Sequence, residues 1–522
     1  MAFFRSLSTV TGLTLLSRLL GYARDVFIGS TFGDSGVSDA FFVALRLPNV
    51  FRRLFAEGAL NSSFVPIFTE VYEKEGKDKA LRFVGLVFST LAVILLLLVG
   101  IFECGMPWVM SIIAMGFKSD MDKFNLAINF GYLTFPYIFF IALASLCAGV
   151  LNSLNRFFAA TAAPIILNLF AILAVVFYST HIIQAGYALS LSISLAGIVQ
   201  FLWVFAACWR ANVPVRVTRI QMTPKLKLLL KRMLPGIAGG GVYQFNLLIS
   251  DMIASFVPMA ISYLSYADRI NQFPLSLIGI AMGTVLLPIF SRQVQGNRHE
   301  EAAYMQNRAL QFSFVLTLPA STALAIISLP IIVTLFEHNK FTHEMSINVA
   351  QVLSILSFAL PANVVVKILS ASFFANGDTR SPVKAAIVSM ISNIVFNILL
   401  FQMLSYLGIA LASTLSSWIN MTLLFYWLKK KERLHFDDRL KKTFPLLCLA
   451  STGMGIFLWE ASTILLPYFS GHFLRSLMSL TLLISGGLVI YLLLLKLTKA
   501  FTYKEFSQAM HRAQKDSEVI KI

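Results

Sequence analysis

Long apolar runs alternate with short polar segments along the whole chain. Each run is close to the roughly 20 residues that a helix needs to cross a bilayer, and sustained apolar runs of this length indicate membrane-spanning helices. Fourteen such runs are expected to be spans: 8–32, 39–68, 82–113, 125–151, 158–178, 185–209, 228–256, 259–290, 310–336, 349–374, 383–404, 407–428, 444–466 and 473–497. The pattern therefore predicts an all-α polytopic membrane protein with fourteen transmembrane helices.

Composition agrees with a membrane protein and changes how the net charge is interpreted. The chain is 57% hydrophobic and only 13% charged, whereas soluble globular proteins carry about 25% charged residues. In a soluble protein a net charge of +17 would point to a nucleic-acid partner. In a membrane protein the excess of Lys and Arg belongs to the cytoplasmic loops, so no nucleic acid is expected.

Basic residues collect in alternate loops. They are dense after the second, sixth and twelfth runs and sparse between, since segments 33–38 and 402–408 have none. This alternation places both termini in the cytoplasm. Arg18 and Arg24 interrupt the first run, so the start of the chain is expected to be the first span and not a removable signal peptide.

Short motifs recur at one offset. ALRLPN at 44–49 resembles ADRINQ at 267–272, and VPIF at 65–68 resembles LPIF at 287–290, so the two matches have the same shift to within one position. The shift spans six runs, an even number, so the copies are expected to be parallel repeats related by an axis along the membrane normal. The predicted domains are a six-helix lobe at 1–210, a second at 211–432, two extra helices at 433–498 and a cytoplasmic tail at 499–522.

Dense groups of charged residues, with arginines beside carboxylates, occur in three of these runs. The first two runs hold Arg18, Arg24, Asp25, Asp39, Arg46, Arg52, Arg53 and Glu57, and the eighth holds Asp268 and Arg269. An ionised side chain at the centre of a span costs about 2.5–3.5 kcal/mol on the insertion scale, so such residues normally line a wet substrate path. The alternative is that individual residues snorkel to an interface or form structural pairs.

Helical spacing orients part of this set and indicates its ligand. Asp39, Arg46, Asn49, Arg53 and Glu57 fall on one stripe of a straight helix, and Arg52 joins them only if Pro48 bends it. Six arginines stand against four carboxylates. Paired guanidinium hydrogen bonds fit phosphate oxygens, so the surplus favours an anionic substrate over the cation of a multidrug exporter. Outward movement of an anion gains about 2.3 kcal/mol per charge per 100 mV.

Several longer motifs carry a family resemblance. They are SRLLGYARD, SDAFFVALRLPN and RRLFAEGALNSSFVPIF near the start, with SYADRINQFPLSLIGIAMGTVLLPIFSR and FFANGDTRSPVKAAI further on. They closely resemble the lipid II flippase family MurJ (MviN) of the multidrug/oligosaccharidyl-lipid/polysaccharide exporter superfamily. The resemblance implies a bacterial cytoplasmic-membrane transporter, not an enzyme, that flips the undecaprenyl-diphosphate-linked peptidoglycan precursor to the outer leaflet by alternating access.

The resemblance also implies roles for individual residues. Substrate-binding residues are expected at Arg18, Arg24, Asn49, Arg52 and Arg269, and gating or charge partners at Asp25, Asp39, Glu57 and Asp268. Arg52 is preferred to Arg53 on the motif, against straight-helix periodicity. The last two helices, which contain Gly453, Gly455, Gly486 and Gly487, are expected to hold the polyprenyl tail, although small residues equally serve close helix packing.

Coupling and partners are less determined by the sequence. Asp251 and Asp378 are candidates for a Na⁺ or H⁺ site, and Asp378 fits a helix-capping turn equally well. No cofactor or metal site is expected, because the four cysteines lack CxxC spacing and no P-loop or GxSxG motif occurs. The expected partners are lipid II, membrane lipids and proteins of cell-wall synthesis. The open alternatives are another polyprenyl-diphosphate glycan, a multidrug cation exporter and a cell-wall scaffold.

Overall fold

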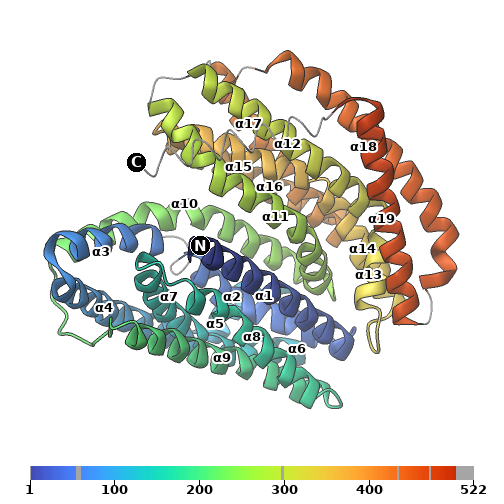
Figure 1. Cartoon of the computed structure of the whole chain (residues 1–522). Coiled ribbons are helices and arrows are strands. Elements are labelled where there is room, and N and C mark those ends of the chain that lie inside the picture. Colours follow the sequence, from blue (N-terminus) through green and yellow to red (C-terminus); the bar gives the residue numbers. More distant parts are fainter. Residues whose placement is uncertain are drawn as a thin grey trace. The chain divides into compact units, whose positions relative to one another are not determined.

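The computed structural model describes residues 2–54, 60–295, 299–431, 434, 436–469 and 472–500. Within these ranges the side chains of 2–8, 61–62, 234–240, 242–243, 277, 279–295 and 299 lie outside the description. The regular structure of the described part is helical (Figure 1). The predicted all-α class is therefore confirmed.

The first half of the chain contains nine α-helices and one short 3₁₀ turn in its described part. They are α1 (Ala2–Phe32), α2 (Val37–Phe51), α3 (Asn61–Glu75), α4 (Lys77–Cys104), α5 (Met106–Ile113), η2 (Met115–Ser119), α6 (Met121–Thr134), α7 (Tyr137–Ser153), α8 (Phe158–Phe177) and α9 (Ile182–Arg210).

The rest of the described chain continues in the same way. Its elements are α10 (Pro224–Ala254), α11 (Ala260–Gln295), α12 (His299–Ile326), α13 (Ser328–Phe336), α14 (His343–Ser357), α15 (Leu360–Ala375), α16 (Arg380–Leu404), α17 (Tyr406–Lys430), α18 (Asp438–Leu465), η3 (Leu466–Phe469) and α19 (Phe473–Leu497). Thr223 and Asp437 are the N-cap residues of α10 and α18. The side chain of each accepts a hydrogen bond from the backbone N–H three residues further along the chain, as favourable N-caps do.

The predicted run 39–68 is helical in all its described residues. The helix α2 ends at Phe51, π-helical backbone follows at 52–54 and again at Leu60, residues 55–59 lie outside the description, and α3 begins at Asn61. Pro48 lies inside the last turn of α2, where it removes a backbone donor and disturbs the ladder. A widened turn after the proline re-aims the side chains that follow it.

Ten segments are long and apolar enough to cross a membrane, judged over the described residues. They coincide with ten of the predicted runs. The four other predicted runs lie at α1, α2–α3, α10 and α11, and three of these four carry the charges noted in the sequence. Charged side chains lower the hydropathy of a helix that lines a polar cavity, so composition alone does not distinguish it from a soluble helix.

The beginnings of the helices repeat along the chain at the offset of the motifs. α2 begins at Val37 and α11 at Ala260, while α4 begins at Lys77 and α12 at His299, which is the same shift to within one position. The pairs α5–α13, α6–α14, α7–α15 and α8–α16 keep this shift equally closely. One difference is the π-helical backbone that follows α2, since α11 is α-helical over 36 residues.

The ends of α7 and α15 share one backbone arrangement. Asn155 and Gly377 both take positive φ, 59° and 71°. The next amides, of Arg156 and Asp378, donate to the carbonyls of Leu151 and Phe373, each at 2.9 Å. This is the Schellman helix end, and it occurs twice at the offset of the repeat.

The described chain divides into two compact units. Unit 1 comprises Met1–Tyr266 and Phe336–Met345, and unit 2 comprises Ala267–Leu335 and Ser346–Ile522. Within unit 1, α8 packs between α1 and α9, α7 packs on α9, and α2 packs on α6 (Figure 1). Within unit 2, α16 packs on α17, and α12 packs on α15 and α18. The domain boundary predicted at residue 210 stays a prediction.

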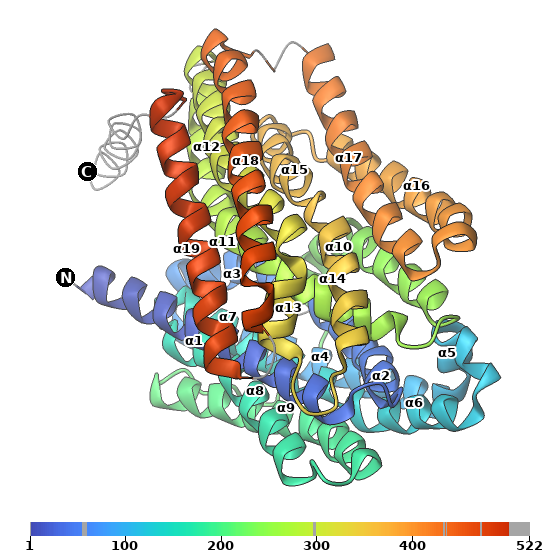
Figure 2. The ribbon, with the colours of Figure 1, turned by 90° about the vertical axis from the view of Figure 1, so that its right-hand side faces the viewer.

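The last two helices pack through their glycines. α18 lies against both α12 and α19 (Figure 2). A Cβ at Gly455 would come within 2.9 Å of Thr322 and Ile326 on α12, and one at Gly453 would come within 2.7 Å of Leu494. Close helix packing, one of the two expected uses of these small residues, is therefore confirmed.

Candidate substrate-binding site

Arg24 is held by two neighbours in unit 1. Its Nη2 and Nε donate to Asp25 Oδ1 at 2.7 and 3.0 Å, and its Nη1 donates to Asn168 Oδ1 of α8 at 3.2 Å. Asn168 Nδ2 in turn donates to the carbonyl of Ser17, so the amide connects two turns of α1. Arg24 is 7% exposed and Asp25 2%. The guanidinium is thus fixed in direction by a charged and a neutral acceptor.

Asp39 is buried completely and is surrounded by donors. Lys123 Nζ donates to Oδ2 at 2.7 Å, and Ser262 Oγ donates to Oδ1 at 2.6 Å. The backbone amides of Met259 and Ser262 donate to the same carboxylate, each at 2.9 Å. These amides belong to the start of α11, so Asp39 caps that helix and places a negative charge at its positive end.

The start of α11 and the 336–345 segment belong to unit 1 together. Tyr266, Phe336 and Phe341 form an aromatic cluster with ring centroids 5.3–5.7 Å apart. The amide of Lys340 donates to the carbonyl of Ser30 at 3.2 Å. Gly33 has φ +52°, and a Cβ there would lie 2.3 Å from the carbonyl of Lys340. Only glycine permits this approach of the 336–345 segment to the end of α1.

Arg46 and Asp251 form a bidentate ion pair between α2 and α10. Arg46 Nη2 donates to Oδ1 at 3.0 Å and Nε donates to Oδ2. The Asp251 side chain is 5% exposed and that of Arg46 is 25% exposed. Arg46, counted in the surplus of cavity cations, and Asp251, the candidate ion ligand, are therefore each other's partners in this structure.

The π-helical turn after α2 brings Arg52 toward Asn49. Arg52 Nε donates to Asn49 Oδ1 at 3.4 Å, and both side chains are half-buried. Arg18 on α1 is half-buried as well. Glu57, the predicted charge partner, lies outside the described residues. The predicted roles of Arg18, Asn49 and Arg52 in binding substrate stay predictions.

Asp268 and Arg269 lie in unit 2. Asp268 accepts a hydrogen bond from Gln272 Nε2, one turn along α11, and Arg269 is exposed. The division between the units falls just before them, at Tyr266. Their expected roles as charge partner and substrate ligand stay predictions.

Asp378, the second candidate ion ligand, occupies a polar turn between α15 and α16. It accepts from the Ser381 amide at 3.0 Å, from Ser381 Oγ at 2.8 Å and from Lys431 Nζ. Burial raises the pKa of this carboxyl, but the bonds from Lys431 and Ser381 outweigh it and hold the pKa below its ordinary 3.8. The carboxylate therefore stays ionised at neutral pH, which suits a turn cap better than a proton carrier.

We expect Asp378→Asn to destabilise the protein by an amount that is constant from pH 8 to 5. A carboxylate whose pKa is lowered by folding stabilises fully above its unfolded pKa, and this contribution fades as the pH falls below it. The difference in stability between wild type and variant should therefore become smaller only below about pH 4. This difference is measured from the denaturant midpoints of the two purified proteins at several pH values. A difference that varies between pH 5 and 8 would contradict the assignment.

Two residues of the site, Lys123 and Asn168, are not predicted from the sequence. Lys123 lies just before the predicted span 125–151 and has no feature that marks it, although it pairs with Asp39. Ser262 shares a face of the eighth run with Tyr266 and Arg269 by helical spacing, but that spacing does not identify Asp39 as its partner. Asn168 carried the one usable signal, since it is a lone amide in the apolar helix α8, and a buried amide needs partners.

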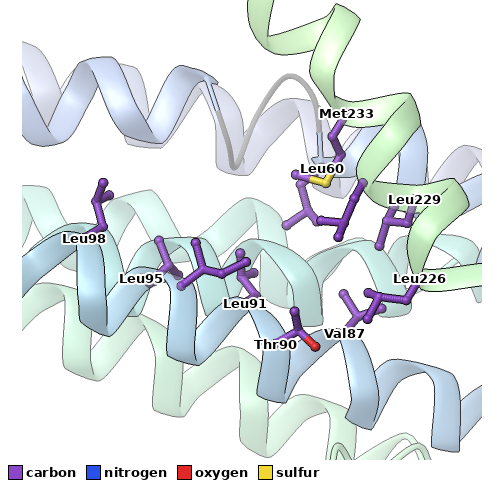
Figure 3. Close-up of a pocket in the computed structure, with 11 residues that line it drawn as sticks. Leu60, Val87, Thr90, Leu91, Leu95, Leu98, Leu226, Leu229 and Met233 are labelled. Atoms are coloured by element: carbon purple, nitrogen blue, oxygen red, sulfur yellow. The ribbon is translucent and has the colours of Figure 1, made fainter. Parts of the chain in front are cut away.

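An apolar cavity of about 200 Å³ lies elsewhere in unit 1 (Figure 3). Leu91, Leu95 and Leu98 of α4 line one side, and Leu226, Leu229 and Met233 of α10 line the other. Thr90 is its polar residue, and its hydroxyl already donates to the carbonyl of Leu86. A cavity with this lining cannot solvate a diphosphate, so it is separate from the charged site.

Sequence comparison assigns the family. The family model described as "Lipid II flippase MurJ" matches residues 28–501. The chain belongs to the MurJ family. A Rhizobium meliloti relative, described as a probable lipid II flippase MurJ, is 42% identical over 94% of this chain and 93% of its own. A Burkholderia cenocepacia lipid II flippase MurJ is 36% identical over 83% of this chain and 84% of its own.

Solved structures agree with the MurJ assignment. A lipid II flippase MurJ in an inward closed conformation superimposes with a TM-score of 0.77 at 26% identity, covering 93% of this chain and 97% of that one. An inward-facing multidrug resistance MATE transporter of the MOP superfamily gives 0.67 at 16% identity, over 83% and 99% of the chains. The second likeness shows that this MurJ-family chain and the MATE transporter share a fold.

Proposed function

We propose that this protein flips lipid II, the undecaprenyl-diphosphate-linked peptidoglycan precursor, from the inner to the outer leaflet of the bacterial cytoplasmic membrane. The observation that carries the proposal is the arginine-rich set on α1 and α2 of a MurJ-family chain. Arg24 in particular is aimed by Asp25 and Asn168. A planar guanidinium held in this way suits two oxygens of a diphosphate.

Alternating access is the proposed route. The contacts at Asp39 and at the 336–345 segment hold pieces of the second half of the chain within unit 1. Opening toward the other side of the membrane would break the hydrogen bonds from the α11 amides to Asp39, and it would break the bond from the Lys340 amide to Ser30 of α1. These contacts are a small set of polar and aromatic interactions, which suits a gate that forms and breaks in each cycle.

The wider architecture of the proposal follows the repeat. We infer fourteen spans in two six-helix lobes, a C-terminal pair that holds the polyprenyl tail, and both termini in the cytoplasm. The recurrence of helix starts at one common offset supports the lobes. Ser262 donates a hydrogen bond to Asp39, and these two positions are separated by the offset of the repeat. Residues related by a two-fold axis contact each other where they lie on that axis.

Membrane potential is the proposed driving force, with a Na⁺ or H⁺ gradient as the second candidate. An anion that leaves a negative cytoplasm gains about 2.3 kcal/mol per charge per 100 mV. A cation at Asp251 would have to displace the Arg46 guanidinium, which already contacts both carboxylate oxygens. Competition between a cation and Arg46 for Asp251 favours the membrane potential over a cation gradient as the driving force.

Leaflet exposure of lipid II in proteoliposomes with an imposed potential tests the function. Labelled lipid II should become accessible from outside at a rate that rises with the potential, and empty liposomes should show none. A folded protein that leaves lipid II in place but moves another polyprenyl-diphosphate glycan would shift the substrate assignment to that glycan. Export of a cationic dye instead would favour the multidrug alternative.

A further inference from the structure

A second cavity in unit 1 combines arginines with an aromatic wall. Its volume is about 660 Å³, and it is lined by Thr9 and Val10 of α1, by the α7–α8 connection and by the end of α9. Arg156 comes from the connection and Arg210 from the last turn of α9. Both follow even-numbered predicted runs, so both arginines belong to the same side of the membrane, predicted to be the cytoplasmic one.

The internal repeat provides a direct comparison for this cavity. Arg156 and Asp378 occupy the same position of the two Schellman helix ends. In unit 2 the carboxylate of Asp378 pairs with Lys431 at the end of α17. In unit 1 the corresponding helix end, α9, also supplies a cation, Arg210. The acidic member of the pair is thus replaced by an arginine, and two like charges line one cavity.

The charges of these two arginines are not balanced by any described neighbour. Within the described part of the chain, no side-chain hydrogen bond or ion pair joins Arg156 or Arg210 to another residue. Two cations around one cavity repel each other. An anion between them would remove the repulsion and accept paired bonds from both guanidinium groups.

The remaining wall indicates the rest of the ligand. The Phe158 and Trp203 rings lie 6.4 Å apart, and Trp203 Nε1 donates to the carbonyl of Ala159. Both ring side chains are substantially exposed, at 54% and 39%. Further along α8 and α9 the apolar face of these helices consists of the exposed side chains Leu169, Leu173, Leu195 and Leu202. Tryptophan beside such a face is typical of the membrane–water interface.

We propose that this cavity binds one anionic phospholipid, with its phosphate between Arg156 and Arg210 and an acyl chain along the apolar face of α8 and α9. Basic pockets between transmembrane helices on the cytoplasmic side are known sites for anionic headgroups. The site holds a lipid of the bilayer and is independent of the transported substrate.

Thermal unfolding of the purified full-length protein tests the site without lipid II. Phosphatidylglycerol titrated into a phosphatidylcholine background should raise the melting temperature of the wild type, because a ligand of the folded state stabilises it. Arg156→Gln/Arg210→Gln should weaken the apparent affinity at least tenfold. The matched control is Arg216→Gln/Arg219→Gln, which removes the same charge from an exposed loop and should respond like wild type.

A third variant introduces into unit 1 the residue found at the equivalent position of unit 2. Arg156→Asp restores in unit 1 the acid–base pair of unit 2, so it should be at least as stable as wild type in phosphatidylcholine and insensitive to phosphatidylglycerol. The proposal is overturned if the double glutamine variant keeps the wild-type response or if the control loses it equally. An equal response to glycerol phosphate would also overturn it, because the ligand would then be a free anion.

Discussion

Arg24→Ala is expected to reduce potential-dependent lipid II flipping by at least tenfold. The guanidinium is buried, and Asp25 and Asn168 fix its direction. A charge-assisted hydrogen bond is worth about 1.5–3 kcal/mol, and a diphosphate would take two from one arginine. The measurement is the initial rate of lipid II exposure in proteoliposomes, normalised to the amount of folded protein inserted.

Graded variants separate binding from folding. Arg24→Lys keeps the charge but lacks the planar fork, so it should fold like wild type and flip more slowly. Asn168→Ala leaves the charge and the Asp25 pair and removes one acceptor, so an intermediate rate is expected. Arg216→Ala, in an exposed loop, serves as the unaffected control. Full flipping by a folded Arg24→Ala protein would remove Arg24 from the substrate path.

Asp39→Asn is expected to cost about 3–5 kcal/mol of stability, the range found when one partner of a buried ion pair is removed. The carboxylate is completely buried and accepts from Lys123, Ser262 and the Met259 amide. Both oxygens of Asp39 accept hydrogen bonds, so the NH₂ group of an asparagine would face donors in place of one of these oxygens. Since Lys123 keeps 13% exposure, the lower part of the range is expected, measured as the denaturant midpoint.

A double-mutant cycle identifies the partner. Lys123→Gln alone should cost less than Asp39→Asn, because the α11 amides and Ser262 still satisfy the carboxylate. Asp39→Asn/Lys123→Gln should be more stable than the sum of the single losses predicts, by about 1–3 kcal/mol. Strictly additive losses would show that the two charges do not interact in the folded protein.

Much of the architecture could be predicted from the sequence. The length of the apolar runs predicted helices throughout, and ten of the runs reappear as helices long and apolar enough to span a membrane in the described part of the chain. The repeat motifs predicted the offset that the helix starts follow. The change from α-helical to π-helical backbone after Phe51 could not be predicted, because a proline inside a helix bends it in some contexts and ends it in others.

The sequence by itself determined the class of the protein, its family and the presence of arginines within predicted membrane-spanning runs, since these depend on composition, run length and local motifs. Tertiary structure decided which partner each charge takes. Arg24 meets Asn168, Asp39 meets Lys123 and Arg46 meets Asp251, each partner coming from a helix far along the chain. Helical periodicity reports which residues share a face of one helix. It carries no information about the side chain that a different helix presents to that face, and this is what fixes the charges of the site.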